Sequence, residues 1–267
     1  MKKWFIFALH SLCWTLCFAQ NQDLHPSAVS QNAFKAGEWF EFRIHYGVFN
    51  ASRVTLELKA DTLDQTPVFH AKGYGRTTGL ARLFFKVEDH YESYFGQKDG
   101  LPRWFIRDIN EGGYTKDLEI RFDHEKKMAH VNNKKKKKKA SFTINENVQD
   151  LISAFYYLRN FYDTSSLKKG EDISLNMFFD QENYLFKLRF LGRETIETAF
   201  GKVRCLKLRP FVQSGRVFSE QESVTLWVSD DQNKIPVKMR ADLRVGSIDC
   251  DLDQFKNLQH PFNIEVK

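Results

Sequence analysis

The sequence predicts an all-β, mainly antiparallel fold: a partial barrel or rolled sheet with one covering helix near 148–160. Three observations lead to this prediction. Apolar residues alternate with polar residues along many short segments, as they do in half-buried strands. Turn-forming residues separate these segments at short intervals. Helices that could cross over between parallel strands are missing, so a βαβ architecture is disfavoured.

The first two strands have the clearest pattern. In residues 39–46 apolar side chains alternate with Glu41, Arg43 and His45, and Gly47 ends the strand. Residues 53–58 alternate again, so the two segments are expected to form a hairpin through 48–52. Further strands are predicted at 68–74, 87–95, 103–109, 114–122, 128–131, 184–190, 203–212, 223–228, 236–243 and 247–252.

Two short segments between the predicted strands stand out by composition. The lysine run Lys134–Lys139 is expected at a hairpin tip, after a strand that ends near Val131 and before one that starts near Ser141. It is either a tolerated expansion in a solvated loop or a patch that attracts anionic lipid head groups or cell-wall polymers. Gly73, Gly75 and Gly79 lack the helix start and the Lys-Ser/Thr pair of a phosphate loop, so they predict a β-bulge or tight corner.

One helix is expected over 148–160, where apolar residues recur at a spacing of three to four. Asn147 is the predicted N-cap, with Asp150 three residues later. The wide aromatic stripe is expected to cover an open end or face of the sheet. The alternative is a movable lid over a cavity.

The N-terminus predicts export. Lys2 and Lys3 precede an apolar run at 4–18 that is too short to span a bilayer, and Ala19 offers a cleavage site. Leu12 and Leu16 precede the nearby cysteines, which disfavours a lipoprotein signal; an uncleaved anchor is the other alternative. The predicted organisation is a signal peptide at 1–19, a disordered lead-in at 20–30 and a single β-rich domain at 31–267. The protein is therefore predicted to be periplasmic, without a transmembrane segment in the mature chain.

Net charge indicates which class of binding partner to expect, and cysteine content indicates whether a disulfide can form. Without Lys2 and Lys3 the chain has 38 basic and 34 acidic residues, and six of the basic ones form the lysine run, so no nucleic-acid partner is predicted. Cys205 and Cys250 remain in the mature chain. Sequence alone is compatible with either a disulfide or two buried thiols, because bonding requires Cα atoms within about 7 Å.

Motifs for catalysis are absent from the sequence. The histidines after residue 20 are scattered singly, and neither a His-Glu-x-x-His pair nor a Gly-x-Ser-x-Gly turn occurs, so no metal or cofactor is predicted. Asp108 and Glu111 are the first residues to consider for a hydrolase acting on envelope glycans. The preferred interpretation of Arg107 is an ion pair with an acid on a neighbouring strand.

Aromatic residues provide the main indication of a ligand. Phe occurs 25 times, often in adjacent pairs such as Phe178-Phe179, whose members point to opposite faces of a strand. A sheet with apolar residues on both faces either has both faces covered by other parts of the protein or has one face that lines a cavity suited to acyl chains. Candidate ligand-binding residues are Phe155, Tyr156, Trp227 and Arg107.

Several strings resemble an uncharacterised exported family of Bacteroidetes, the domain of unknown function 3108. They are 34–38 (FKAGE) with Tyr46-Gly47, 75–79 (GRTTG), 107–114 (RDINEGGY), 149–151 (QDL) with 155–159 (FYYLR), 192–195 (GRET), and 227–231 (WVSDD) through Ile235-Pro236. The similarity covers nearly all of the mature chain. It implies neither an activity nor a catalytic residue.

The final third, with Trp227, an acidic turn, Ile235-Pro236 and Gly246, resembles periplasmic lipoprotein carriers, which are partial β-barrels with helices over an apolar concavity. The leading hypothesis is therefore a non-enzymatic cell-envelope protein that binds a lipid, a lipoprotein acyl chain or another apolar ligand. The second is an envelope interaction or scaffolding protein with a filled core and a protein partner. The third is the glycan hydrolase.

Overall fold

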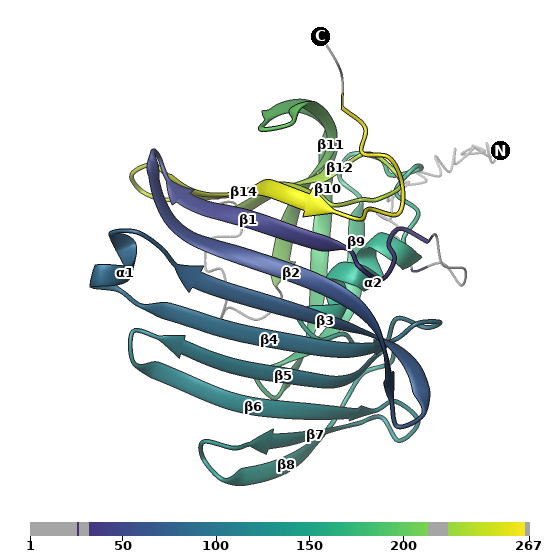
Figure 1. The fold of residues 1–267 in the computed structure, drawn as a ribbon. Coiled ribbons are helices and arrows are strands. Elements are labelled where there is room, and N and C mark those ends of the chain that lie inside the picture. The colour runs from purple at the N-terminus through teal and green to yellow at the C-terminus, as the bar shows by residue number, and fades with distance from the viewer. Residues whose placement is uncertain (1–25, 27–31, 213–223, 265–267) are drawn as a thin grey trace, which may run out of the picture.

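The computed structural model describes Pro26 and residues 32–212 and 224–264. Its strands form one antiparallel 14-stranded sheet that curls into an open barrel, which confirms the predicted all-β fold (Figure 1). The signal peptide expected at 1–19 lies outside the described residues. The strands are β1 (Trp39–Tyr46), β2 (Phe49–Leu63), β3 (Thr66–Thr77), β4 (Val87–Gly96), β5 (Pro102–Glu111), β6 (Tyr114–Asp123), β7 (Met128–Asn133), β8 (Lys138–Thr143), β9 (Asp172–Phe179), β10 (Glu182–Thr198), β11 (Gly201–Val212), β12 (Val224–Ser229), β13 (Pro236–Asp242) and β14 (Ser247–Lys256).

The sheet is a meander that begins in its own middle. The strand order is β8-β7-β6-β5-β4-β3-β2-β1-β14-β13-β12-β11-β10-β9, so β1 pairs with β2 on one side and with the last strand, β14, on the other. Every other pair joins consecutive strands. The two edge strands, β8 and β9, are therefore neighbours in sequence, and the segment between them has to connect the two edges of the sheet.

That segment holds the edges together without a continuous ladder. The backbone N–H of Gln149 donates to the Asn176 carbonyl, and the N–H of Phe178 donates to the Gln149 carbonyl, each at 2.9 Å. The Asn183 side chain reaches across the same gap and donates to the Thr143 carbonyl at 2.9 Å. Phe178 packs in one buried cluster with residues of β5–β8. An edge that is covered in this way presents fewer unpaired groups to another chain.

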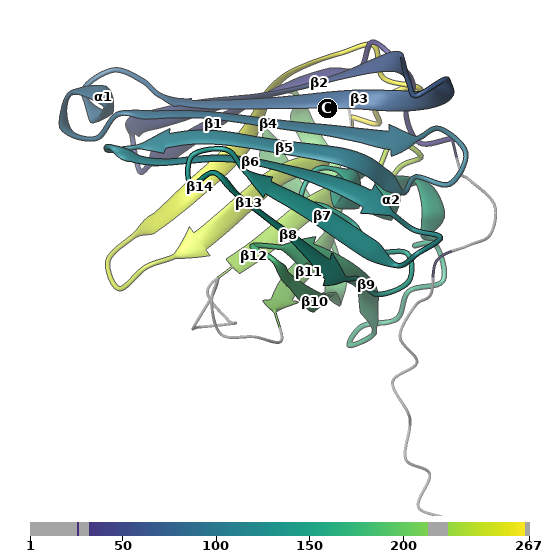
Figure 2. The same ribbon diagram turned by 90° about the horizontal axis from the view of Figure 1, so that it is seen from below.

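The two helices lie at opposite ends of the barrel (Figures 1 and 2). Helix α2 (Ser153–Phe161) lies inside the curl, at the end that carries the β2–β3, β4–β5 and β6–β7 turns; we call this the helix end. Tyr156 packs in a cluster with residues of β2–β4, whereas Tyr157 packs in a cluster with residues of β9–β11. The other end, which carries the β1–β2, β5–β6 and β7–β8 turns and α1 (Ala81–Phe84), is the open end.

The predicted start of the long helix is wrong by five residues. Asn147 is not its N-cap but has a left-handed backbone with φ of 52°, and Gln149 is engaged with β9. Asp150 caps the first turn instead, because its side chain accepts the N–H groups of Ile152 and Ser153. Before residue 153, Val148 packs in the cluster that contains Phe178, Ile152 packs with residues of β2–β4, and Leu151 is exposed.

Other local expectations have mixed outcomes. The lysine run does lie at a hairpin tip, since residues 134–137 connect β7 and β8. The bulge expected at the glycines is wrong for Gly73 and Gly75, which pair regularly with both neighbouring strands. Strand β9 and the short helix α1 were not predicted.

Candidate functional site

The interior of the barrel near the open end has an exposed apolar wall. Strand pairing places Ile44 beside Cys250 and Cys250 beside Met239, while Tyr46 lies beside Ile248. This face points inward, because Phe40 on the same side of β1 meets the ring of Phe155 on the segment of α2. Met239 is nevertheless 42% exposed and Ile248 41% exposed. We call Ile44, Val54, Met239 and Ile248 the inner wall.

Two glycines of β3 keep space free beside this wall. A Cβ on Gly75 would meet only Val54 Cγ2, at the ordinary contact distance of 3.7 Å. A Cβ on Gly73 would meet Ile152 at 3.6 Å. Because neither glycine forms a bulge, the consequence of glycine here is a missing side chain on the inward face.

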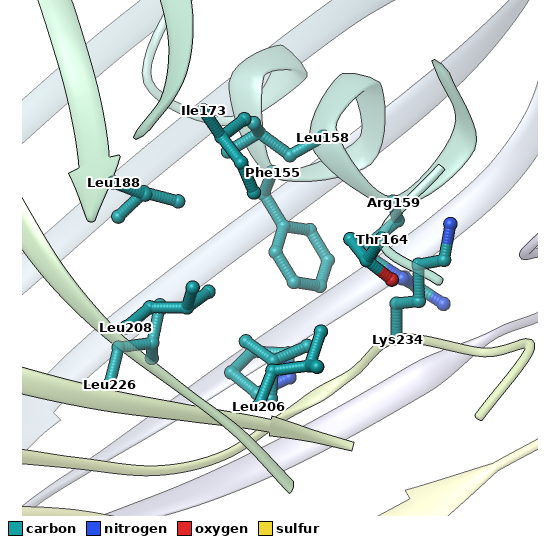
Figure 3. Close-up of a pocket in the computed structure, with 12 residues that line it drawn as sticks. Phe155, Leu158, Arg159, Thr164, Ile173, Leu188, Leu206, Leu208, Leu226 and Lys234 are labelled. Atoms are coloured by element: carbon teal, nitrogen blue, oxygen red, sulfur yellow. The ribbon is translucent and has the colours of Figure 1, made fainter. Parts of the chain in front are cut away.

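A small apolar cavity lies deeper, between α2 and strands β9–β13 (Figure 3). Its volume is about 70 Å³. Ligand pockets usually measure about 300–1,000 Å³, so the cavity alone is too small for a lipid. Leu226, one of its lining residues, pairs with Met239, so the cavity adjoins the inner wall. The lining residues are Phe155, Leu158, Arg159, Thr164, Ile173, Leu188, Leu206, Leu208, Leu226, Val228, Lys234 and Pro236.

Of the candidate ligand-binding residues, only Phe155 reaches this cavity, where its ring points inward from α2 (Figure 3). Tyr156 is 1% exposed and stacks on Phe95 at 5.2 Å, on another side of the helix. Trp227 alternates with the cavity-lining Leu226 and Val228 and so points to the opposite face of β12. Its indole N–H donates to the Glu194 carboxylate.

Arg107 forms part of a charged cluster between β5, β6 and the β9–β10 turn. The predicted partner on a neighbouring strand is wrong: the guanidinium donates to Asp180 at 2.9 Å, and Lys116 pairs with the same carboxylate. The guanidinium also lies 4.8 Å from the centroid of the Phe179 ring. The Asp180 carboxylate therefore links the β9–β10 turn to β5 and β6 across the gap in the barrel.

The two acids considered for hydrolysis do not come together. Asp108 is exposed and lies three residues from Glu111, so the two side chains leave opposite faces of β5. Glu111 instead neighbours Asp89, which is 9% exposed. Burial, together with the like charge of Glu111, raises the pKa of Asp89. The pair that sequence analysis considered is therefore not placed to flank one substrate.

Sequence analysis missed a buried ion pair beside the cavity. Arg159 on α2 is 3% exposed and donates to both carboxylate oxygens of Glu38, at 2.6 and 2.8 Å. It also donates to the backbone carbonyls of Asn233 and Ala33. Arg159 therefore ties α2 to the segment before β1, which contains Ala33 and Glu38, and to the β12–β13 turn, which contains Asn233. The lowered pKa of nearby Lys234, about 8, results mainly from burial.

The buried carboxyl group of Asp150 is expected to make a pH-dependent contribution to the free energy of unfolding. Burial raises its pKa to about 6, although the Ser93 hydroxyl and two backbone N–H groups donate to it. The folded protein thus holds this proton more tightly than the unfolded chain, whose Asp pKa is about 3.9. The stabilising contribution is complete below pH 4 and is lost as the pH rises through 6, by on the order of 3 kcal/mol.

The variant Asp150→Asn isolates this contribution. We expect the free energy of unfolding of the wild type, minus that of the variant, to fall between pH 4 and 7 in urea titrations. Asp64→Asn, at a side chain that is 87% exposed, is the control and should give no such trend. A pH-independent difference for Asp150→Asn would contradict the assignment.

The described residues hold both cysteines as free thiols. Cys205 is on β11 and Cys250 on β14, and β12 and β13 separate these strands. Three strand spacings amount to about 14 Å, well beyond the reach of a disulfide. Within the described ranges, groups of three or more His, Cys, Asp or Glu that could hold a metal ion are absent. Among the same residues, helices long and apolar enough to cross a membrane are also absent.

Comparison with solved structures gives matches from several bacteria. A β-barrel-like protein of the DUF1849 family from Brucella abortus matches with a TM-score of 0.52 and 8% identity, over 88% of this chain and 100% of that chain. A DUF1089 family protein from Pseudomonas aeruginosa has a TM-score of 0.38 and 11% identity, over 70% of this chain and 88% of that one. A Bacteroides fragilis protein, provisionally described as exported with a YmcC-like fold, has a TM-score of 0.33 and 8% identity, over 88% and 99%.

At these identities the first structure shows a shared fold alone, and the other two add no argument. No curated protein matches the chain. The resemblance noted from the sequence strings does have direct support, because the family described as a protein of unknown function (DUF3108) matches residues 41–253. The chain therefore belongs to the DUF3108 family.

Proposed function

We propose that the protein is a non-enzymatic periplasmic protein of the cell envelope that binds an acyl chain of a lipid or lipoprotein inside the barrel. The chain lies along the inner wall, and its end enters the cavity beside α2. The observation that carries the proposal is the exposure of Met239 and Ile248 on the inward face of the sheet. Apolar side chains on the concave side of a barrel gain free energy when an apolar ligand covers them.

The dimensions favour an open groove over an enclosed pocket. The cavity of about 70 Å³ is roughly half the size of an engineered apolar cavity that binds benzene, so it accepts only the tip of a chain. The remainder of the ligand needs the inner wall. Gly73 and Gly75 support this placement, because their missing side chains leave room on the inward face of β3.

The export signal predicted at 1–19 supports a periplasmic location, where acyl chains of lipids and lipoproteins have to be shielded from water. The alternative of a scaffolding protein with a filled core is consistent with the packed helix end. It gives no reason for the apolar inner wall at the open end, so ligand binding is the preferred function.

Filling the groove tests the proposal. We expect Gly75→Phe to weaken binding of palmitate by about tenfold or more, measured by displacement of an apolar fluorescent probe. The backbone tolerates the change, because Gly75 lies in regular strand pairing and its added Cβ makes only ordinary contacts. Arg76→Phe places the same ring on the adjacent, exposed position and should bind palmitate like the wild type.

A second variant tests the groove independently, so that misfolding of Gly75→Phe would not decide the outcome. Met239→Trp enlarges a residue of the inner wall that is already 42% exposed, and thermal melting should show that it folds. It too should lose palmitate binding. Failure of the wild-type protein to displace the probe with palmitate, or unchanged binding by both groove variants, would overturn the proposal.

A further inference from the structure

The open end of the barrel carries a row of exposed apolar side chains. Phe84 is 88% exposed, Val48 89%, Val245 75% and Leu83 78%. Soluble proteins seldom expose large contiguous apolar patches without a binding role. We call this set the open rim; its members are Val48, Phe49, Leu80, Leu83, Phe84, Phe85, Tyr114, Leu243 and Val245.

Sheet topology explains why residues so distant in sequence gather there. The β13–β14, β1–β2, β3–β4 and β5–β6 connections lie side by side because their strands are consecutive in the sheet. Figures 1 and 2 show these connections at the same end, together with α1. The β7–β8 turn with Lys134–Lys137 follows next along the same edge.

The open rim is held in place although its side chains are exposed. The Tyr46 hydroxyl donates to the Val245 carbonyl at 2.9 Å, which ties the β13–β14 turn to β1. The Gly112 N–H donates to the Lys86 carbonyl at 2.8 Å, and the Phe85 ring occupies the space where a Cβ on Gly112 would lie. These hydrogen bonds and the ring contact fix the connections that carry the exposed apolar residues. The apolar residues therefore have a defined position before a partner binds.

Basic residues outnumber acidic ones around the open rim when the β7–β8 turn is included: they are Arg82, Lys86, Arg244 and Lys134–Lys137, against Glu88, Glu111 and Asp242. Arg82 and Lys86 flank the apolar residues of α1, and Arg244 lies between Leu243 and Val245. Arg82 and Lys86 share one acid, Glu88, as their ion-pair partner. Within the described part of the chain, Lys136, Lys137 and Arg244 have no acidic partner in any ion pair. Basic residues next to exposed apolar tips complement a surface that is anionic outside and apolar below.

The shape favours a bilayer over a protein partner. Neighbouring hairpin tips are about 10 Å apart along a curved edge, so the apolar residues project as separate points. A protein partner would need matching pockets along the same curve to pack against them. A bilayer needs no such match, because its interfacial region admits separate apolar side chains between head groups.

We propose that the open rim docks on a bilayer that contains anionic lipid, with its apolar tips in the interfacial region and Lys134–Lys137 over the head groups. Docking in this way would direct the open end, and with it the inner wall, toward the membrane. The proposal goes beyond acyl-chain binding and does not depend on it, since a docked protein with an empty interior would still sediment with vesicles.

Vesicle co-sedimentation tests the docking. We expect the purified protein to bind vesicles of phosphatidylglycerol and phosphatidylcholine at least about tenfold more tightly than vesicles of phosphatidylcholine alone. The variant Leu83→Ser/Phe84→Ser should weaken binding to the anionic vesicles by a similar factor. Leu151→Ser is the matched control: its side chain is 45% exposed but precedes α2 at the helix end, and its binding should not change.

A charge variant separates the electrostatic contribution. Lys136→Glu/Lys137→Glu should abolish the preference for anionic vesicles, while palmitate displacement stays at the wild-type level. Equal binding to both kinds of vesicle, no vesicle binding, or unchanged binding by the Leu83/Phe84 variant would each overturn the proposal. Crosslinking of the open rim to an envelope protein in cells, without vesicle binding by the pure protein, would identify a protein as the occupant instead.

Discussion

Replacing Arg159 with methionine is expected to lower the free energy of unfolding by about 3–5 kcal/mol in urea titrations at pH 7. The Glu38 side chain is fully buried, so the variant leaves a carboxylate in the interior without its bidentate partner. Besides the two bonds to Glu38, the bonds from Arg159 to the Asn233 and Ala33 carbonyls also disappear. Because these acceptors belong to two separate segments, the one before β1 and the β12–β13 turn, the loss is expected to loosen α2 from the rest of the barrel.

Two further variants test whether the unpaired carboxylate of Glu38 causes this loss of stability. Glu38→Gln combined with Arg159→Met removes both charges and should recover part of the lost stability. Lys126→Met removes an exposed ion pair with Asp123, at a side chain that is 78% exposed, and should change stability by less than about 1 kcal/mol. A double variant as unstable as Arg159→Met alone would assign the loss to packing and would contradict the role given to the ion pair.

Truncation of Phe178 to alanine is expected to cost about 3–5 kcal/mol. The ring is 1% exposed and meets Phe122 edge to face at 6.1 Å and Phe142 at 5.9 Å. These contacts join β9, at one edge of the sheet, to β6 and β8 at the other side of the gap. We therefore expect amide hydrogen exchange to accelerate in β8 more than in the central strand β1.

Phe84→Ala is the matched control, because it removes the same ring from a position that is 88% exposed. It should alter the free energy of unfolding by no more than about 0.5 kcal/mol. Uniform acceleration of exchange over β1 and β8 in the Phe178 variant would show that the ring stabilises the whole sheet rather than the contact between its edges.

The fold could be predicted because it depends on local alternation. Segments such as 39–46 and 114–122 have the period of two that an inward and an outward face impose, and they form β1 and β6. Strand β9 has a similar signal, since Ile173, Leu175 and Met177 alternate with polar residues, but it is not among the predicted strands. The start of α2 could not be predicted from spacing, because Val148 and Ile152 are apolar for packing against the sheet although they precede the helix.

The site was harder to predict because it depends on pairs distant in sequence. Glu38 and Arg159 are 121 residues apart, although both occur in strings that resembled the family. The partner of Arg107 is 73 residues away, across the gap between the sheet edges. Phe155 lines the cavity and Trp227 does not, because alternation reveals which residues share a face but not which face is inward. Their role in ligand binding stays a prediction.

Binding inside the barrel and docking by the open rim would have complementary roles. The open rim would place the barrel opening at a bilayer surface, and the inner wall would then receive an acyl chain without exposing it to water. Each has its own variants: Gly75→Phe changes the interior, and Leu83→Ser/Phe84→Ser changes the edge. A protein that loses one binding activity and retains the other would show that the two surfaces act separately.

The most direct measurement of acyl-chain binding is methyl NMR of the protein labelled at methionine methyl groups during titration with palmitate. Met239 lies on the inner wall. Met128 precedes the buried Ala129 on β7, so its side chain points to the opposite, outer face of that strand. We predict that the Met239 methyl resonance shifts and shows nuclear Overhauser contacts to the acyl chain, while the Met128 resonance stays in place. A Met239 resonance that does not move at palmitate saturation, or one that moves no more than Met128, would contradict binding inside the barrel.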